Sequence, residues 1–306
     1  MDIFLQQLIN GLVLGSIYAL IALGYTMVYG ILELINFAHG EITMFGAMVG
    51  IALLQVLLPG GSVLVAMTLA VGGAVLVCVA LGLVVERVAY RPLREAPRLA
   101  VLITAIGVSI VLQNVAMLIW GKQYISFPSG LETPTYDLGG ASITGLQIAI
   151  VLLAQLLMVL LLLLVYRTRL GRAMRATAQS PDLAGLMGIN PNTIIAITFA
   201  LGAALAAIAG IMVGAYYGLA HYYMGFLLGL KAFTAAVLGG IGNVAGAMLG
   251  GLLLGVIESL GAGYIGTLTG GFLGSHYQDV FAFLVLILVL VLRPSGLLGG
   301  RTADRA

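Results

Sequence analysis

The chain has 306 residues, of which 61% are hydrophobic and only 8% are charged, with a formal net charge of +2. Because a soluble domain carries about 25% charged residues, this composition excludes a soluble globular protein and predicts an integral membrane protein. The basic loops also contain acidic residues, among them Glu86, Glu95 and Asp182, so the charge pattern argues against a surface for nucleic acid.

Each helical crossing of a bilayer takes about 20 apolar residues, and the chain offers nine stretches of roughly this length. The fold class they predict is an all-α polytopic membrane protein, a helical bundle of eight or nine transmembrane segments with one or more broken or re-entrant helices. We expect residues 1–306 to form a single membrane domain. The predicted crossings are 8–29, 42–58, 63–85, 99–119, 144–165, 193–214, 222–241, 244–262 and 276–292.

Eleven of the thirteen basic residues fall into three runs, in the loops 86–98 and 166–192 and in the tail 293–306. Loops rich in Lys and Arg stay on the cytoplasmic side of a membrane, so these segments are expected inside and 120–143 outside. Nine full crossings would then place the N-terminus outside. One re-entrant or split stretch would reduce the number to eight, and the N-terminus could then lie inside.

Two segments, 30–41 and 222–243, are candidates for a broken helix because they combine glycine with polar residues in apolar surroundings. In the first, Glu33, Asn36 and His39 are three residues apart and would form one slanted stripe if the segment were helical. Ionisable groups at membrane depth usually face the interior of a bundle or a water-filled cavity. These three residues are therefore candidates for the translocation path or a gate.

The alternative for the same residues is a structural polar network that caps a broken helix, with Glu41 favoured by the dipole of the next span. A proton relay would need further acids in the spans, and only Glu258 is a clear intramembrane candidate, with Asp279 near an end. Lys231 could neutralise Glu258, reach a lipid headgroup or lie near a substrate carboxylate. Asp279 is one helical turn from His276 and is expected to pair with it.

Glycine accounts for 43 of the 306 residues, and small residues recur at four-residue spacing in several spans. Small residues let helix backbones approach closely in lipid, so this pattern predicts tight helix packing, which is compatible with a mobile bundle. A break around Gly240 and Asn243 precedes one such span, much as the break at Asn36 precedes another. This weak likeness between the halves suggests an internal repeat and makes Gly240 and Asn243 further candidates for the translocation path.

The longest internal polar stretch, 166–192, contains the signals of a short helix outside the bilayer. Ser180 suits the N-cap and Pro181 the first helical position, while Gly188 suits the C-terminal end. The apolar side of this helix would fit a groove in a partner protein or, alternatively, rest on lipid headgroups. That side consists of Leu183, Leu186 and Met187.

Several motifs together resemble the permease family of branched-chain amino acid ABC transporters, over nearly the whole chain. The Arg-Ala-x-x-Ala pattern, with Ala184 and the Gly188-Ile189 ending, is similar to the cytoplasmic coupling loop of ATP-binding-cassette importer permeases. Length and motif order fit the H-type subunit. The other matching stretches are Ile35 to Glu41, Gly171 to Ala176, Val237 to Asn243 and Leu292 to Gly299.

The resemblance implies a multi-pass permease of the bacterial plasma (inner) membrane that forms half of a pathway for leucine, isoleucine or valine. Its expected partners are a second, related permease, two cytoplasmic ABC ATPases and an external substrate-binding protein. The residues that the resemblance assigns to ATPase coupling are Arg172, Arg175, Ala176, Pro181, Asp182, Ala184 and Gly188.

No cofactor is expected on this chain. It lacks a G-x-x-x-x-G-K-[ST] phosphate loop, since Leu230 stands where the second glycine of the nearest candidate must fall. ATP and Mg²⁺ would therefore be bound by the partner ATPases. Three histidines and one cysteine are scattered without ligand spacing, and no catalytic constellation is visible, so neither a metal site nor an enzyme is predicted.

Two other functions stay open at this point. An importer for urea, short amides or other amino acids would share the pattern, although the large extra N-terminal region often found in a related subunit is missing, which favours amino acids. A secondary transporter working alone is a different class, and the scarcity of intramembrane acids argues against it. The substrate itself is not encoded in a readable way, because a cavity of Ala, Gly, Leu and Phe leaves no signature.

Overall fold

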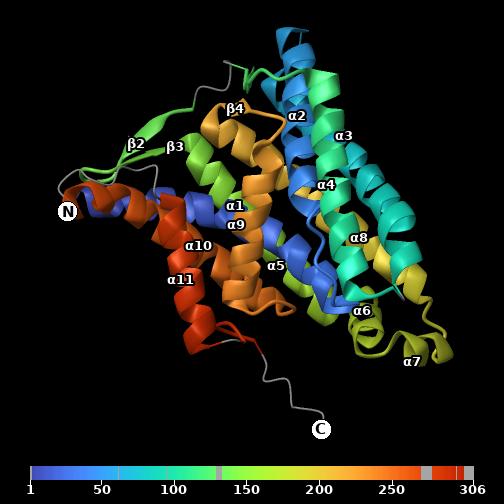
Figure 1. Ribbon diagram of the computed structural model, residues 1–306. Coiled ribbons are helices and arrows are strands. Elements are labelled where there is room, and N and C mark those ends of the chain that lie inside the picture. The colour runs from blue at the N-terminus through green and yellow to red at the C-terminus, as the bar shows by residue number, and fades with distance from the viewer. Residues whose placement is uncertain are drawn as a thin grey trace.

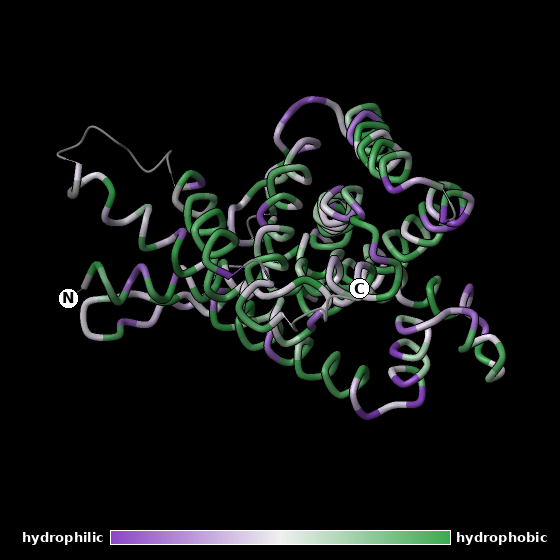
Figure 2. Tube along the Cα trace, turned by 60° about the horizontal axis from the view of Figure 1, so that its bottom comes forward, coloured by the Kyte–Doolittle hydropathy of each residue, from purple (hydrophilic) through white to green (hydrophobic). Residues whose placement is uncertain are grey.

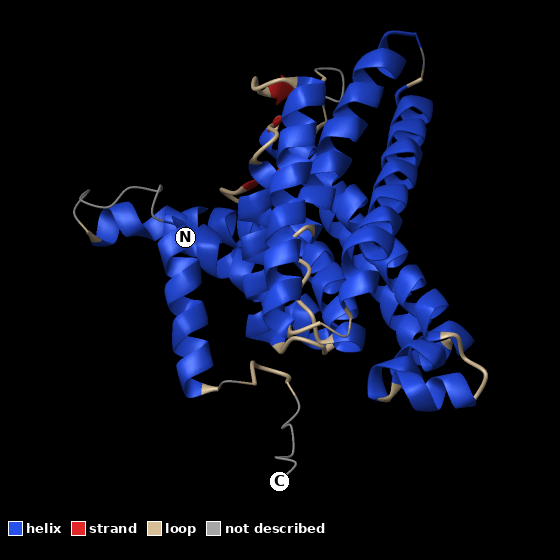
Figure 3. Ribbon diagram, turned by 45° about the vertical axis from the view of Figure 1, so that its right-hand side comes forward, coloured by secondary structure: helices blue, strands red, loops and turns tan. Residues whose placement is uncertain are grey.

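The computed structural model describes residues 2–60, 62–94, 96–128, 133–269, 278–293 and 295–299. Within them the chain is mostly α-helical, and two short antiparallel strand pairs are the only sheets (Figure 1, Figure 3). Helices dominate because a helix satisfies its own backbone hydrogen bonds, which lipid cannot do. The predicted fold class, an all-α polytopic membrane protein, is confirmed.

Nine helices coincide with the nine predicted crossings, with boundaries shifted by a few residues. Seven of them are long and apolar enough to span a membrane, whereas Met224–Gly239 and the apolar stretch Phe283–Leu292 are shorter. The choice between eight and nine crossings stays a prediction. The helices are α1 (Asp2–Leu32), α2 (His39–Leu57), α3 (Val63–Val85), α4 (Arg98–Trp120), α5 (Gly145–Arg167), α8 (Pro191–Tyr217), α9 (Met224–Gly239), α10 (Val244–Leu268) and α11 (Gln278–Leu292).

The segment 166–192 contains two helices, α6 (Arg169–Gln179) and α7 (Pro181–Leu186). The sequence pattern predicted only α7. A π-helical turn, Glu86–Tyr90, continues α3, and 3₁₀ turns cover Leu58–Gly60 and Arg91–Leu93. The strands are β1 (Ile125–Ser126), β2 (Thr135–Asp137), β3 (Ser142–Thr144) and β4 (Leu219–Ala220), with β1 paired to β4 and β2 to β3.

All four strands lie at one end of the bundle, which we call the strand end (Figure 1). The β1–β4 pair joins the exit of α4 to the exit of α8, so both helices finish there. The start of α1 lies at the same end, because Gln6 exchanges hydrogen bonds of 3.1 and 2.8 Å with the backbone of Ser142 in β3.

The opposite end, which we call the arginine end, contains the α3–α4 connection together with α6 and α7 (Figure 1). Glu33, just after α1, forms an ion pair of 3.3 Å with Arg98 at the start of α4. Arg94 donates a 2.6 Å hydrogen bond to Asn192 at the start of α8. Helix α1 therefore runs from the strand end to the arginine end, as nine alternating crossings require. Hydrophilic residues gather in the connections between the apolar helices (Figure 2).

Helix α1 forms the centre of the bundle and packs against α5, α8, α9 and α10. Its tightest neighbour is α10, where glycines on both helices remove the side chains that would keep the backbones apart. A Cβ placed on Gly11 would lie 2.7 Å from Cα of Val256, and one on Gly15 would lie 2.8 Å from Cα of Leu252. The predicted role of the small residues in helix packing is confirmed.

Both predicted breaks are present, between α1 and α2 and between α9 and α10. Glu33 ends α1 with a left-handed backbone (φ +53°), and residues 33–38 are not helical. The stripe expected for Glu33, Asn36 and His39 is therefore wrong, because the helix stops before these residues can share one face. Glu33 is exposed, whereas the other two are buried.

Candidate functional site

Helix α7 forms as the sequence predicted. The Ser180 hydroxyl accepts a hydrogen bond of 3.3 Å from the backbone N–H of Leu183, and Pro181 occupies the first turn. Gly188 follows with a left-handed backbone (φ +81°), which lets the N–H of Ile189 bond back to the Ala184 carbonyl at 3.0 Å. A rigid cap and a rigid stop thus fix this six-residue helix at the arginine end.

The apolar side of α7 is uncovered. Leu183 is 63% exposed and Leu186 and Met187 are each 83% exposed, whereas Ala184 faces inward at 3%. Asp182 and Pro181 are exposed at the start of the same helix. Such a contiguous apolar tip beyond the ends of the membrane helices is typical of a surface that a partner protein covers.

Helix α6 anchors α7 to the bundle. Arg175 donates a hydrogen bond to the Val165 carbonyl at the end of α5, and its guanidinium lies 5.6 Å from the centre of the Tyr166 ring. Arg172 on the same helix is exposed, and Ala176 is partly buried. Of the predicted coupling residues, Arg175 and Ala184 therefore join the segment to the bundle, while Arg172, Asp182 and Gly188 lie on its surface.

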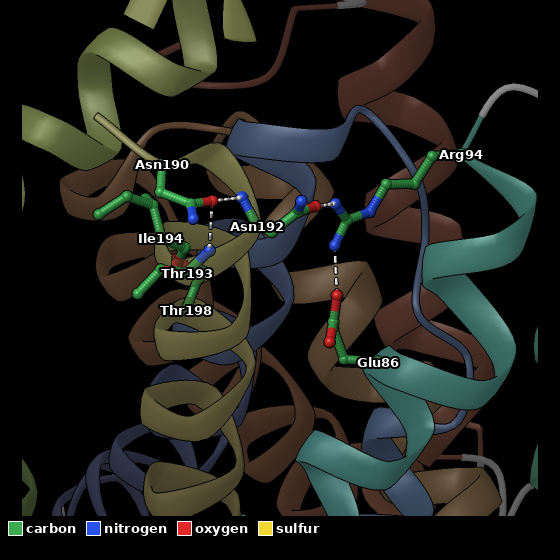
Figure 4. Close-up of polar contacts among 7 residues, drawn as sticks. All are labelled: Glu86, Arg94, Asn190, Asn192, Thr193, Ile194 and Thr198. Carbon is green, nitrogen blue, oxygen red and sulfur yellow. Dashed lines mark hydrogen bonds and ion pairs between the residues drawn. The ribbon is translucent and has the colours of Figure 1, made fainter. Parts of the chain in front are cut away.

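A polar link connects the exit of α7 to two membrane helices (Figure 4). The Asn190 side chain caps α8 by accepting hydrogen bonds from the backbones of Asn192 (3.0 Å) and Thr193 (3.4 Å). Arg94 then bridges the Asn192 side chain and the Glu86 carboxylate on the π-helical turn after α3. These contacts connect the exit of α7 to the start of α8 and to the end of α3.

Asn36 and His39 lie in the interior, at the break before α2. The Asn36 side-chain oxygen accepts a hydrogen bond of 3.0 Å from the Tyr90 hydroxyl. The rings of His39 and Tyr25 pack edge to face, with their centres 4.9 Å apart. Asn36 Nδ2 and His39 Nε2 are buried and have no hydrogen-bond partner among the described residues. The structure thus brings these two candidates close to the bundle core, but not Glu33, whose exposed ion pair contributes little stability.

Glu41 is the most deeply buried carboxylate near this break, at 0% exposure. One of its oxygens accepts hydrogen bonds from Ser109 (2.9 Å) and Gln113 (2.7 Å) on α4. The sequence predicted that the dipole of α2 favours Glu41, but the two hydrogen-bond donors on α4 were not predicted. Their spacing of four residues in an otherwise apolar helix was the available signal, since it puts both on one face.

The second break lies at the arginine end. Gly240 and Gly242 have positive φ values of 105° and 92°, and the Asn243 side chain caps α10 through Gly246 N–H at 3.1 Å. Asn243 also donates a 2.8 Å hydrogen bond to the carbonyl of Leu298, so the segment near the C-terminus covers this turn. A pocket of about 110 Å³ is lined by Gly242 together with Gly30 and Arg175, which places the second break beside α6.

Lys231 is the centre of a buried charge cluster. Its ammonium lies 2.7 Å from Glu258 Oε1 and 2.7 Å from Asp279 Oδ1, and Tyr18 donates a hydrogen bond of 3.2 Å to the same Glu258 oxygen. The predicted Lys231–Glu258 pair is confirmed. Asp279 is the second partner of Lys231. The expected pairing of Asp279 with His276 stays a prediction, because His276 lies outside the described residues.

This charge cluster lies beside a pocket of about 360 Å³ near the strand end. Lys231 and Tyr18 supply polar atoms to its wall, and the remaining lining is mainly aromatic and aliphatic. A mostly apolar pocket with a few convergent polar groups is the usual form of a site for a small molecule. The other lining residues are Tyr124, Val213, Tyr217, Leu219, His221, Tyr223, Met224, Leu227 and Leu228.

The fold is that of a polytopic helical membrane protein with a buried charge cluster at Lys231, and sequence similarity places it among the membrane permeases. The sequence matches the family described as "Branched-chain amino acid transport system / permease component" over residues 7–290, and the chain belongs to this family. The permease protein LivH of Salmonella typhimurium, from a high-affinity branched-chain amino acid transport system, is 47% identical over 303 residues, covering 97% of this chain and 96% of LivH.

Two further relatives have higher and lower sequence identity to this chain than LivH has. BraD of Pseudomonas aeruginosa, also a permease protein of a high-affinity branched-chain amino acid transport system, is 50% identical over the same share of both chains. The autoinducer 2 import system permease protein LsrC of Escherichia coli is 30% identical over 180 residues, which cover 57% of this chain and 50% of LsrC. The family resemblance of the sequence motifs is therefore confirmed.

Proposed function

We propose that this permease imports branched-chain amino acids across the bacterial plasma membrane, powered by two ATPase subunits that bind its arginine end. Sequence identities of 47% to LivH and 50% to BraD, each over 97% of this chain, support branched-chain amino acids as the substrate class. The arginine end faces the cytoplasm in this proposal, because basic loops are retained there. A second, related permease completes the pathway, and an external binding protein delivers the amino acid at the strand end.

The observation that carries the coupling role is the capped, uncovered apolar tip of α7. Closure of the ATPase pair on ATP would press on Leu186 and Met187, each 83% exposed. Because Asn190, Asn192 and Arg94 link α7 to α8 and α3, the push would tilt these helices together. Tight glycine contacts let the helices move as packed units, which opens one end of the bundle as the other closes.

The pocket near the strand end supports a small amino acid with an apolar side chain as the substrate. Its aliphatic wall, including Val213 and Leu228, suits a branched side chain, while the polar atoms of Lys231 and Tyr18 suit the charged main-chain groups. Asn36 lies further along, in the non-helical link between α1 and α2, and His39 and Glu41 lie in the first turn of α2. Non-helical backbone at membrane depth is tolerated only inside protein or beside a water-filled cavity.

The test is ATP-dependent uptake by the full complex after substitution of the α7 tip. Leu186→Glu with Met187→Glu places two charges in the proposed apolar contact, and we expect loss of leucine uptake and of ATPase co-purification. The membrane level of the permease should stay normal, because both side chains are exposed. Gln179→Glu, on the exposed end of α6, is the matched control. Normal uptake in the double variant would refute the coupling role.

Substrate class is tested separately by competition. Leucine, isoleucine and valine should each displace labelled leucine in the unmodified complex, whereas urea and short amides should not. Displacement by urea at the same concentrations would assign the complex to the related importers instead.

A further inference from the structure

A third pocket, of about 490 Å³, lies at the arginine end between the end of α3 and the start of α8. It is larger than the two pockets described above. Its Glu86, Asn190 and Asn192 belong to the polar link of α7, but its Arg87 and Arg91 have no role in the coupling helix or the translocation path proposed above. Its lining residues are Leu83, Glu86, Arg87, Arg91, Asn190, Asn192, Thr193, Ala196, Ile197 and Ala200.

Both walls of this pocket change from apolar to polar in the same direction. Along α3 and its continuation, Leu83, Arg87 and Arg91 follow one another and all line the pocket. Along α8, Ala200 and Ala196 lie deeper in the bundle than Asn192, which is at the helix start. A bilayer has the same order, from its hydrocarbon core to its charged headgroups.

Two guanidinium groups in the pocket, those of Arg87 and Arg91, have no ionic or hydrogen-bonding partner among the described residues. The Glu86 carboxylate is occupied by Arg94, whose other nitrogen donates to Asn192 (Figure 4). Arg87 and Arg91 are exposed and form no ion pair or hydrogen bond with any of the residues that the structure describes. Guanidinium groups match phosphate oxygens through paired, charge-assisted hydrogen bonds. The polar half of the pocket thus fits a phosphate group.

We propose that this pocket binds an anionic phospholipid, with its phosphate at Arg87 and Arg91 and an acyl chain along Leu83, Ala196 and Ala200. A free phosphate would leave the apolar half of the pocket unused, whereas an acyl chain attached to the phosphate would fill it. Basic pockets between membrane helices on the cytoplasmic side are suited to such headgroups. The bound lipid would brace α3 against α8, next to the joint between α7 and α8.

The test measures lipid retention by the purified full-length permease, using native mass spectrometry after incubation with phosphatidylglycerol or phosphatidylcholine. We expect selective retention of phosphatidylglycerol, and Arg87→Gln with Arg91→Gln should weaken it by about tenfold or more, since charge-assisted hydrogen bonds are lost. Arg167→Gln with Arg169→Gln removes the same charge from exposed positions at this end that do not line the pocket, and should leave retention unchanged.

A second variant separates lipid from free phosphate. Ala200→Phe fills the apolar half while leaving both arginines in place, so it should lower phosphatidylglycerol retention and leave the permease folded, as judged by its elution profile. Equal losses in the Arg167 and Arg169 control would mean general charge attraction and overturn the proposal. Displacement of the lipid by inorganic phosphate with no effect of Ala200→Phe would overturn it in favour of a phosphate site.

Discussion

Lys231 illustrates how a single residue can stabilise several helices at membrane depth. Its ammonium forms ion pairs with Glu258 on α10 and Asp279 on α11 and donates a hydrogen bond to the Tyr18 hydroxyl on α1. Charged groups inside a membrane are costly unless paired, so this cluster holds four helices in register. The cluster also lines the pocket near the strand end, which links packing to the proposed substrate site.

Removing the lysine should destabilise the fold strongly. In Lys231→Met, the buried Glu258 carboxylate loses its partner, and breaking such a pair typically lowers the free energy of unfolding by about 3–5 kcal/mol. The double variant Lys231→Met, Glu258→Gln removes one of the unpaired charges and should recover part of the loss. Thermal unfolding in detergent, followed by Trp120 fluorescence, measures both. A single variant as stable as the unmodified protein would show that the pair contributes nothing.

Helices α1 and α10 pack closely because glycines at their contact let the two backbones approach each other. Gly15→Ala would place a Cβ 2.8 Å from the Leu252 backbone, and such overpacking typically costs about 1–3 kcal/mol of the free energy of unfolding. Gly107→Ala on α4 is the matched control, because a Cβ there has no neighbour within 4 Å. We expect a lower unfolding temperature for the first variant only. Equal temperatures would mean that α1 and α10 can separate without loss.

The cap of α7 is expected to matter for coupling. Ser180→Ala removes the acceptor for Leu183 N–H and should reduce the stability of this short helix by about 1 kcal/mol, whereas Ser180→Asp keeps an acceptor. Hydrogen exchange at α7 amides should rise in the alanine variant, with lower uptake per ATP hydrolysed, and return toward normal in the aspartate variant. Unchanged exchange in Ser180→Ala would show that packing alone fixes α7.

Local signals predicted local features well. Hydropathy located all nine apolar helices, and the cap residues at 180, 181 and 188 located α7. Helix α6 was missed because its three arginines resemble a polar loop, and it packs against α5 and α8 in the folded chain.

Features that depend on distant parts of the chain were not readable. Helix α1 ends at the left-handed backbone of Glu33, and a glutamate does not predict such a conformation. Asn36 contacts Tyr90, which is distant in the sequence, only in the folded chain. Asp279 pairs with Lys231, which is distant in the sequence, because α11 packs on α9. Such pairings are set by tertiary packing. The sequence could therefore predict which buried residues belong to the candidate site, but not which of them contact one another.

For the whole molecule, the two ends carry different chemistry. The strand end presents aromatic residues and the pocket beside Lys231, whereas the arginine end presents basic residues and the bare apolar tip of α7. This asymmetry matches a permease that receives substrate at one end and is driven from the other. The central claim is therefore that α7 faces the cytoplasm and is covered there by ATPase subunits.

Site-directed labelling tests this claim most directly. In a Cys78→Ala background, Leu186→Cys on α7 and Tyr124→Cys near the strand end, 83% and 66% exposed before substitution, are treated with a membrane-impermeant maleimide. Leu186→Cys should react only in inside-out vesicles and be protected by the ATPase subunits, while Tyr124→Cys should react only in intact, outer-membrane-permeabilised cells. Labelling of position 186 from outside such cells would reverse the orientation and contradict the account.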